Sequence, residues 1–446
     1  MELKNQKIGI VGLGLRTGPS LVKYLHARQA EIYVFDEKSE DKLKDSLKLI
    51  KDIPVHLELG RLSPESLAEC KTWIVSPGVP CYKPYLVDAR RRDIQTISEL
   101  EFCTNFVQVP LIAITGSNGK STTTALLTHI LQGWKKRIFI GGNFGSPLVE
   151  ALEKPFDFIV LEVSTFQMEL TESIHPKVAC VLNVTPNHLD RHGNMATYTS
   201  LKEKLLQNMV KEDIAVLNDD DEDCRFIGAR TQATTWMFSW KNRKHAPIHV
   251  EDQTIVFPDR RTISIKNLNL LGNHNIQNTV AAVSMAVAID CPKDVIEKQL
   301  QSFKGLPHRL ENVGEYRGIT FFNDAKSSTP ESSIQALNAL TGSIVYIAGG
   351  RSKNASYRDL ADILKKKAKK AFLYGECAEQ MKSQLLGVEV EVFSTLDNAF
   401  KGAVQSVGKS ETILYSPANS SFDQYENFEK RGEHFVRLIE EFSKKK

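Results

Sequence analysis

The chain has 446 residues, 41% of them apolar and 25% charged, which is the balance of a soluble globular protein rather than a disordered or membrane chain. This length is too great for one compact core, so we expect three domains of ordinary size. Lysine and arginine together exceed aspartate and glutamate by only three, and basic runs such as 365–370 are typical of solvated helix faces. We therefore expect no nucleic-acid partner.

The cysteines and the N-terminus point to a reducing compartment. Seven widely spaced cysteines form no CxxC pair, which argues against structural zinc and against a disulfide framework. The first residues run straight into a buried-strand pattern, and no stretch approaches membrane-spanning length. The sequence thus predicts a cytoplasmic protein without a membrane segment.

Strands and helices alternate from the N-terminus as in a parallel, doubly wound sheet. The expected segments are an apolar strand running into glycines at 7–14, a helix at 21–27, a strand at 31–36 that ends in Asp36, and a strand with a following loop at 72–79. We predict a Rossmann-like N-terminal domain over residues 1–104.

The same alternation restarts near residue 105. The expected segments are a strand, glycine loop and helix at 109–131, strands at 156–164 and 178–185, and a helix at 273–289. Residues 235–270 alternate apolar and polar residues between turns, which predicts a small antiparallel excursion. We predict a central P-loop-type ATP-binding domain with a mostly parallel sheet over residues 105–304.

A third alternation begins after residue 311 and completes an α/β fold class with three domains in series. Apolar strands followed by small or polar residues are expected at 319–328, 343–350, 370–376 and 412–418. Ligand residues in open parallel sheets cluster at such carboxyl ends. We predict a C-terminal Rossmann-like α/β domain over residues 305–446.

The stretch "ITGSNGKSTTT" at 114–124 resembles a shortened phosphate-binding loop. The ordinary P-loop has its first glycine where Ile114 stands, whereas here the loop reads Gly116-Ser-Asn118-Gly119-Lys120-Ser121-Thr122. Backbone N–H groups at the start of a helix face phosphates, the lysine supplies a point charge, and a hydroxyl of Ser121 or Thr122 reaches Mg²⁺. The loop predicts a phosphate-binding site.

A second glycine loop lies at residues 12–18. It reads "GLGLRTG", one residue more than the GxGxxG pattern, and Asp36 ends the next strand. Alone it suggests a dinucleotide-binding dehydrogenase, and a tight turn without a ligand is the alternative. Two nucleotide sites in one chain suggest that one holds ATP and the other a nucleotide-bearing substrate.

Two consecutive strand ends beside the phosphate loop carry candidate metal ligands. Glu162 ends a buried strand, where a carboxylate is costly unless it is paired or ligating, and His188 and Asp190 follow the next strand. A lone histidine in such a loop is more often a capped loop residue, but the combination with Glu162 favours a metal site. By chemistry alone, Lys202 and Lys204 on the following helix are surface lysines.

Eight ordered motifs resemble those of the Mur ligase family. They are "AITGSNGKSTTT", "GGNFGSPL", "LEVSTFQME", "NVTPNHLDRHG", "LGNHNIQNTVAA", "GLPHRLE", "FNDAKSS" and "SPANSSFDQYENFEKRG", and with the first loop they extend to within some twenty residues of the end. The resemblance is strongest to the branch that adds D-glutamate. It implies a monomeric, ATP-dependent, amide-forming ligase that joins D-glutamate to UDP-N-acetylmuramoyl-L-alanine through an acyl phosphate, with two Mg²⁺ or Mn²⁺ ions, in peptidoglycan precursor synthesis.

The resemblance also implies roles for individual residues. The uridine nucleotide is contacted by Leu15, Thr17, Asp36 and Gly78, and the muramoyl part by Asn143 and His188. The phosphates and metal are held by Gly116, Asn118, Gly119, Lys120, Ser121, Thr122, Glu162 and His188. A carbamylated lysine serves as a further metal ligand, for which Lys202 fits the spacing better than Lys204. Lys120, His188 and Lys202 are the catalytic candidates.

For the rest of ATP and for the amino acid, the resemblance implies two more sets. ATP contacts are expected from Asn275, Asn278, Arg309 and Asp324. D-Glutamate contacts are expected from Lys326, Ser328, Lys353, Ser421, Phe422 and Phe428, where lysines facing an acidic amino acid make electrostatic sense.

The chain departs from the family pattern at three places. Arg16 is an insertion in the first loop, Ser328 replaces a threonine in "AKSST", and "NSS" at 419–421 replaces a cysteine-containing stretch. The last two changes bear on the amino-acid pocket more than on the reaction type.

Four other functions remain open. They are a sister Mur ligase with another amino acid, a folylpolyglutamate synthase, a nicotinamide-dependent dehydrogenase built on the first loop, and a nucleotide-binding scaffold without catalysis. The sister ligase for lysine or diaminopimelate carries an Asp-Asn-Pro-Arg motif where this chain has "GGRSKNAS". The dehydrogenase leaves the ATP loop unexplained.

Overall fold

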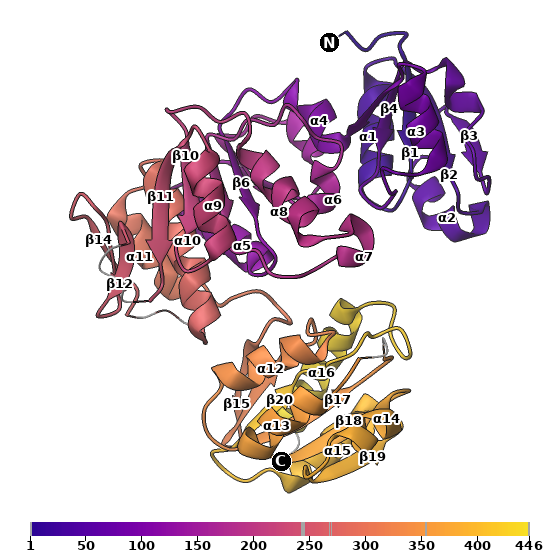
Figure 1. Ribbon diagram of the computed structural model, residues 1–446. Coiled ribbons are helices and arrows are strands. Elements are labelled where there is room, and N and C mark those ends of the chain that lie inside the picture. Colours follow the sequence, from indigo (N-terminus) through magenta and orange to yellow (C-terminus); the bar gives the residue numbers. More distant parts are fainter. Residues whose placement is uncertain (1, 242–245, 267, 269, 353–354, 445–446) are drawn as a thin grey trace. The chain divides into compact units, whose positions relative to one another are not determined.

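The computed structural model describes residues 2–241, 246–266, 268, 270–352 and 355–444 (Figure 1). The chain divides into two compact units. The first contains residues 1–268 and 276–301, and the second contains 269–275 and 302–446. The first unit holds two sheets and the second holds one, so the predicted α/β class with three sheets is confirmed.

The N-terminal sheet of the first unit has the strand order β3-β2-β1-β4-β5, and all of its paired strands are parallel. The strands are β1 (Lys7–Val11), β2 (Glu31–Asp36), β3 (His56–Leu59), β4 (Thr72–Val75) and β5 (Gln95–Ser98). The helices are α1 (Thr17–Ala27), α2 (Glu40–Lys48), η1 (Ser66–Glu69), α3 (Pro84–Arg91) and α4 (Glu99–Thr104). Strand order reverses beside β1, so the first glycine loop lies at the point where open sheets of this type bind ligands.

The central sheet has the order β14-β13-β12-β11-β10-β9-β6-β8-β7. Its strands are β6 (Leu111–Thr115), β7 (Ile138–Gly142), β8 (Phe158–Glu162), β9 (Val178–Val181), β10 (Ile214–Asn218), β11 (Thr234–Ser239), β12 (Ile248–Glu251), β13 (Thr254–Val256) and β14 (Thr262–Ser264). Its helices are α5 (Lys120–Gly133), η2 (Leu148–Glu153), α6 (Thr165–Met168), α7 (Leu189–His192), α8 (Met195–Glu203), η3 (Lys204–Leu206), α9 (Glu222–Arg230), α10 (Asn273–Ala288) and α11 (Lys293–Ser302). Every residue of β6 is buried, as expected for a strand covered on both faces.

The prediction of an antiparallel excursion over residues 235–270 was partly wrong. Strand β11 pairs in parallel with β10, and β12 pairs in parallel with β11. Only the short pairs β12–β13 and β13–β14 are antiparallel. Strand β11 is only partly buried near this edge of the sheet, so its sequence has the mixed polarity of an antiparallel strand although its pairing is parallel.

The second unit has the strand order β15-β16-β20-β17-β18-β19. The strands are β15 (Glu311–Tyr316), β16 (Ile319–Asn323), β17 (Ile344–Gly349), β18 (Ala368–Tyr374), β19 (Val390–Phe393) and β20 (Thr412–Tyr415). Only the β15–β16 pair is antiparallel among these described strands. The helices are α12 (Pro330–Ala339), α13 (Arg358–Lys367), α14 (Ala378–Gln384), α15 (Leu396–Ser406) and α16 (Phe428–Lys444).

The buried core of the first unit is continuous across its two sheets. One cluster of buried side chains includes Ile10 and Leu25 of the N-terminal sheet region, Phe102 of α4, and Leu148 and Leu161 of the central sheet region. The segments that carry the two glycine loops therefore share one continuous hydrophobic core. In the described part of the chain no helix is both long enough and apolar enough to span a membrane.

Candidate nucleotide and ligase site

The phosphate loop joins β6 to α5, where backbone conformation demands glycine. Gly116 and Gly119 have φ angles of 154° and 86°, and Gly119 is the N-cap of α5 without a side-chain cap. The Lys120 ammonium turns back to donate hydrogen bonds to the carbonyl oxygens of Gly116 at 2.7 Å and Ser117 at 3.1 Å. The first N–H groups of α5, which no side chain of the N-cap satisfies, form a site suited to an anion.

Neighbouring segments fix the shape of this loop. The Asn118 N–H donates to Oδ1 of Asn183 at 2.8 Å, and Nδ2 of Asn183 donates to the Asn118 carbonyl at 3.2 Å. The Ser117 hydroxyl lies 3.0 Å from the hydroxyl of Tyr198 and donates to the Thr185 carbonyl at 2.9 Å. The sequence analysis missed Asn183 and Tyr198, although Asn183 follows β9 at the same edge of the sheet as the loop.

Glu162 ends β8 next to β6 and is only 1% exposed. Its Oε1 accepts a hydrogen bond from Nδ2 of Asn143 at 2.6 Å. Its Oε2 has no hydrogen-bond partner among the described residues. A buried carboxylate oxygen without a donor is costly, and a divalent cation beside the phosphate loop would satisfy it.

His188 lies at the start of α7 with a φ angle of 54°, and its ring is 4.7 Å from the ring of Phe166. Partial burial lowers the pKa of its imidazole, and the positive charge of Lys120 lowers it further. The neutral imidazole is the form that binds a metal ion. Asp190, the other predicted polar residue of this loop, is exposed.

Lys202 is 2% exposed, and its Nζ lies 4.4 Å from the ring centroid of Tyr198. Burial, followed by the charge of Lys120, lowers the pKa of the Lys202 ammonium to about 7. Lys204 instead pairs with Glu172 at 2.6 Å and donates to the Met168 carbonyl. A lysine that is partly neutral near pH 7 can react with CO₂, so the burial and lowered pKa of Lys202 fit the predicted carbamylation better than the ion-paired Lys204 does.

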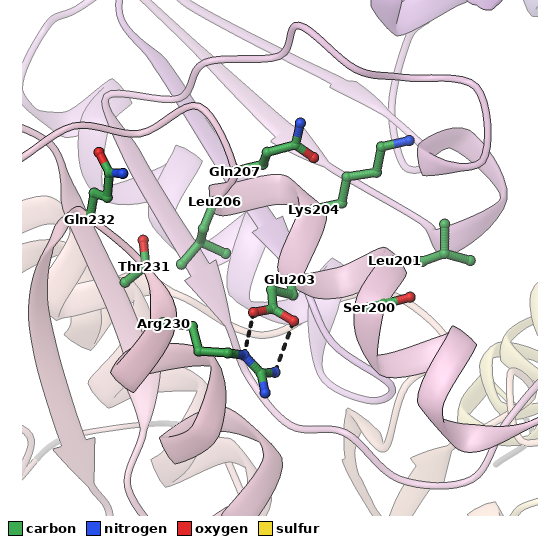
Figure 2. A pocket seen from close by; sticks show the side chains of 9 residues that line it. All are labelled: Ser200, Leu201, Glu203, Lys204, Leu206, Gln207, Arg230, Thr231 and Gln232. Carbon is green, nitrogen blue, oxygen red and sulfur yellow. Dashed lines mark hydrogen bonds and ion pairs between the residues drawn. The ribbon is translucent and has the colours of Figure 1, made fainter.

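The described residues contain no group of three or more His, Cys, Asp and Glu side chains arranged to hold a metal. For a complete metal site, Glu162 and His188 would need a third ligand. Carbamylated Lys202, whose new group is anionic and ligates through oxygen, would supply it. A separate cavity of about 560 Å³ lies against α8 and η3 (Figure 2), with Glu203 and Arg230 forming a bidentate ion pair in it. Lys202 does not line this cavity, which is therefore not the predicted metal site.

The first glycine loop is organised around a carboxylate. Asp36 is 8% exposed, and its two oxygens accept hydrogen bonds from the backbone N–H groups of Leu13 and Lys38, each at 2.9 Å. Leu15 is exposed and Thr17 is the first residue of α1. Gly78 is exposed in the loop after β4, with open space where a side chain would stand.

Arg16, the inserted residue of this loop, contacts the central part of the first unit. Its Nη2 donates to the carbonyl oxygens of Gly145 and Gly142, and its Nη1 donates to that of Asn143 at 3.5 Å. The Asn143 side chain in turn donates a hydrogen bond to the Glu162 carboxylate. Arg16 thus links the first glycine loop directly to the segment that positions Glu162.

The residues predicted to contact the rest of ATP belong to both units. Asn275 and Asn278 are buried on α10, and a Cβ at Gly119 would collide with the Asn278 side chain. Arg309 is half-buried, in the segment before β15. Asp324 accepts hydrogen bonds from the Leu310 N–H at 3.1 Å and the Ser416 hydroxyl at 2.6 Å, while burial raises the pKa of its carboxyl to about 6.

The second unit brings together two of the residues predicted for the amino acid, Lys326 and Phe428. The Lys326 ammonium lies 3.8 Å from the ring centroid of Phe428, and the ring of His308 lies 6.4 Å from that of Phe428. Ser328 is half-buried and Ser421 is buried. Phe422 is 62% exposed, and Lys353 lies outside the described residues.

Comparison with known proteins identifies the family. Residues 6–98 match the model described as "Mur ligase MurD-like, N-terminal domain", residues 114–286 the "Mur ligase middle domain", and residues 308–419 the "Mur ligase, glutamate ligase domain". The chain is 36% identical over 445 residues to the UDP-N-acetylmuramoylalanine--D-glutamate ligase of Koribacter versatilis, covering 98% of each chain. The chain therefore belongs to the Mur ligase family.

Further relatives carry the same name. The chain is 34% identical to the UDP-N-acetylmuramoylalanine--D-glutamate ligase of Caldanaerobacter subterraneus, covering 98% of this chain and 99% of that protein. Among solved structures, MurF ligase from Thermotoga maritima in complex with ADP matches with a TM-score of 0.63 and 18% identity over 99% of both chains. MurC from the same organism matches with a TM-score of 0.62 and 19% identity, over 98% of this chain and 99% of that one. At such identities the structures support the shared fold alone.

Proposed function

We propose that the chain is an ATP-dependent ligase that joins the amine of D-glutamate to the alanyl carboxylate of UDP-N-acetylmuramoyl-L-alanine in peptidoglycan precursor synthesis. The observation that carries this proposal is the 36% identity, over 98% of each chain, to a relative named for that reaction. The shortened phosphate loop beside a buried, half-partnered carboxylate is the geometry that such chemistry needs.

The reaction begins with activation of the carboxylate. An oxygen of the alanyl carboxylate attacks the γ-phosphorus of ATP, and the bond to the β-phosphate oxygen breaks, which gives an acyl phosphate and ADP. The Lys120 ammonium, held at the loop carbonyls, exchanges these hydrogen bonds for phosphate oxygens when ATP binds. Its charge then offsets the negative charge that develops during transfer.

The second step forms the amide. The D-glutamate amine attacks the acyl carbon, and phosphate leaves from a tetrahedral intermediate. Lys326 and Phe428 are assigned to the incoming amino acid. The Lys326 ammonium complements an acidic ligand, and the Phe428 ring lies directly against this ammonium. Ser328, Ser421, Phe422 and Lys353 are proposed for the same pocket.

Two divalent cations, Mg²⁺ or Mn²⁺, are proposed as cofactors. The residues present fit them, because Oε2 of Glu162 has no donor among the described residues, and burial together with the charge of Lys120 lowers the pKa of the His188 imidazole. Glu162, His188, the Ser121 hydroxyl and carbamylated Lys202 would hold the ions. When bound, the ions supply positive charge to the phosphates.

The uridine nucleotide is assigned to the first glycine loop, with Leu15, Thr17, Asp36 and Gly78 as contacts and Asn143 nearer the muramoyl part. We propose that the enzyme is an active monomer in the cytoplasm, where ATP is available. Light scattering during size-exclusion chromatography would test the monomer, and an active species found only as a dimer would contradict it.

The decisive test measures phosphate release from ATP with Mg²⁺ and UDP-N-acetylmuramoyl-L-alanine. D-Glutamate is compared with L-glutamate, L-lysine, diaminopimelate and no amino acid. Release that depends on D-glutamate supports the proposal. Release with another amino acid keeps the ligase chemistry and overturns the specificity, whereas no release with any of them favours a folate substrate or a scaffold.

A further inference from the structure

A buried arginine connects separate segments of the second unit. Arg431 lies in α16 and is 0% exposed. Its Nη2 donates hydrogen bonds to the carbonyl oxygens of Ala325 at 2.9 Å and Asn419 at 3.0 Å. These two carbonyls follow β16 and β20, which are neighbouring strands of the sheet. One guanidinium nitrogen therefore fixes the spacing of two strand-end loops.

These loops carry the residues assigned to the amino acid. Ala325 directly precedes Lys326, and Asn419 stands two residues before Ser421. Helix α16 begins with Phe428, whose ring lies against the Lys326 ammonium. A displacement of Arg431 would thus move three parts of the assigned pocket relative to one another.

The first turns of α16 are also held close to His308 and Asn323. Gly432 packs against the ring of His308, where a Cβ would collide with it. Nδ2 of Asn323 donates to the Gly432 carbonyl at 3.3 Å and also lies 2.9 Å from Nδ1 of His308. These contacts at the residue next to Arg431 hold this part of α16 against His308 and Asn323.

A contribution to the stability of the fold does not by itself explain why an arginine is buried at position 431. Its Nε and Nη1 are buried and have no hydrogen-bond partner among the described residues. Burying a guanidinium with unused donors costs free energy that a well-packed apolar side chain would not. The two carbonyl contacts, which join the pocket loops, are the interactions that the side chain does make.

We propose that Arg431 is a positioning residue that sets the affinity and stereochemical selectivity for the incoming amino acid, without touching it. This inference rests on the proposed ligase function. Arg431 fixes the distance between the loop that follows β16 and carries Lys326 and the loop that follows β20 and carries Ser421. The enzyme recognises D-glutamate through groups on both loops, so their spacing decides which amino acid fits.

The test compares Arg431→Lys and Arg431→Gln with Arg437→Lys, a control at an exposed position of the same helix. Lysine is one atom shorter than arginine and cannot reach both carbonyls, and glutamine is shorter still. We expect both Arg431 variants to raise KM for D-glutamate about tenfold or more, the factor given by loss of one charge-assisted hydrogen bond between a displaced pocket loop and the amino acid. The preference for D- over L-glutamate should fall in parallel.

A second readout separates positioning from general damage. Acyl-phosphate formation from ATP and UDP-N-acetylmuramoyl-L-alanine, trapped with hydroxylamine in the absence of an amino acid, should stay within about twofold of the parent in each variant. An equal fall in both steps, an unchanged KM for D-glutamate, or loss of cooperative folding in both variants would overturn the inference. Failure of the parent enzyme to use D-glutamate would instead overturn the proposed function.

Discussion

The two glycine loops of the first unit look alike in sequence but are built around opposite charges. In the first loop, the Asp36 carboxylate accepts the N–H groups of Leu13 and Lys38. In the second, the Lys120 ammonium at the start of α5 donates to loop carbonyls, and the N-cap residue makes no side-chain cap. A carboxylate at a loop repels phosphate, whereas an ammonium attracts it. This difference in charge is consistent with our proposal that the first loop binds the uridine nucleotide and the second binds the triphosphate.

The largest effect is expected from Lys120→Ala. Loss of the ammonium removes charge stabilisation of phosphoryl transfer, so kcat should fall about a thousandfold or more. Thermal unfolding should change little, because the Lys120 ammonium donates to carbonyl oxygens of a loop that the paired hydrogen bonds between Asn118 and Asn183 also hold in shape. Lys135→Ala, at an exposed position just beyond the same helix, is the control. A near-normal rate for Lys120→Ala would remove the second loop from catalysis.

Alanine at matched glycines tests the two loops separately. Gly119→Ala should raise KM for ATP about tenfold, because the new Cβ collides with Asn278 and a left-handed φ of 86° disfavours alanine by about 1–2 kcal/mol. Gly14→Ala, with a φ of 52° but open space around it, should lower the melting temperature slightly and leave KM for ATP unchanged. Steady-state kinetics and calorimetry distinguish these outcomes; equal effects on ATP would contradict the division of roles.

Asp36→Asn should weaken the first loop alone. The new side-chain amide keeps one acceptor oxygen for one of the two backbone N–H groups, but its NH₂ group faces the other N–H and repels it. KM for the UDP-substrate should therefore rise about tenfold. The KM values for ATP and D-glutamate should not change. Asp41→Asn on the exposed start of α2 is the matched control. A uniform loss across all three substrates would mean that Asp36 supports the whole fold instead.

The smallest effect on activity is expected from Glu99→Gln, at the contact between the two loop regions. Glu99 is buried, its Oε1 accepts the Val149 N–H at 2.8 Å, and burial raises the pKa of its carboxyl from 4.5 to about 7. Since the folded state holds this proton more tightly than the unfolded state, the parent loses stability as pH rises from about 4.5 to about 7.

Chemical unfolding across that pH range gives the measurement. The stability of Glu99→Gln relative to the parent should increase from about pH 4.5 to about pH 7 and then stay constant. Glu101→Gln, two residues along α4, changes a carboxylate that accepts the N–H groups of Glu172 and Ser173 and is a comparison for a different contact of the same helix. A pH-independent difference for Glu99→Gln would show that Glu99 is ionised in the folded protein.

Much of the architecture was predictable from local patterns. The strands that end in glycine or polar residues, the helix after Lys120, and the strand that ends in Asp36 all follow from apolar runs and their boundaries, and the structure confirms them. The family resemblance is confirmed as well. The roles assigned to single site residues and the domain boundaries stay predictions. Strand β11 was misjudged because its first residues are exposed although it is an interior strand paired in parallel, so its polarity pattern is that of an antiparallel strand.

The sequence by itself determined the order of the elements, the glycines at positive φ in the phosphate loop, and the placement of Lys120 at a helix start, Glu162 at a strand end and His188 in the segment after a strand. These depend on local backbone preferences and on side chains a few residues apart. Only the tertiary structure decided that Lys202 is buried with a lowered pKa while Lys204 is paired, and that Arg431 joins two loops about a hundred residues apart in the chain. Burial and hydrogen bonding at such separations depend on how the sheets and helices pack, which no local pattern specifies.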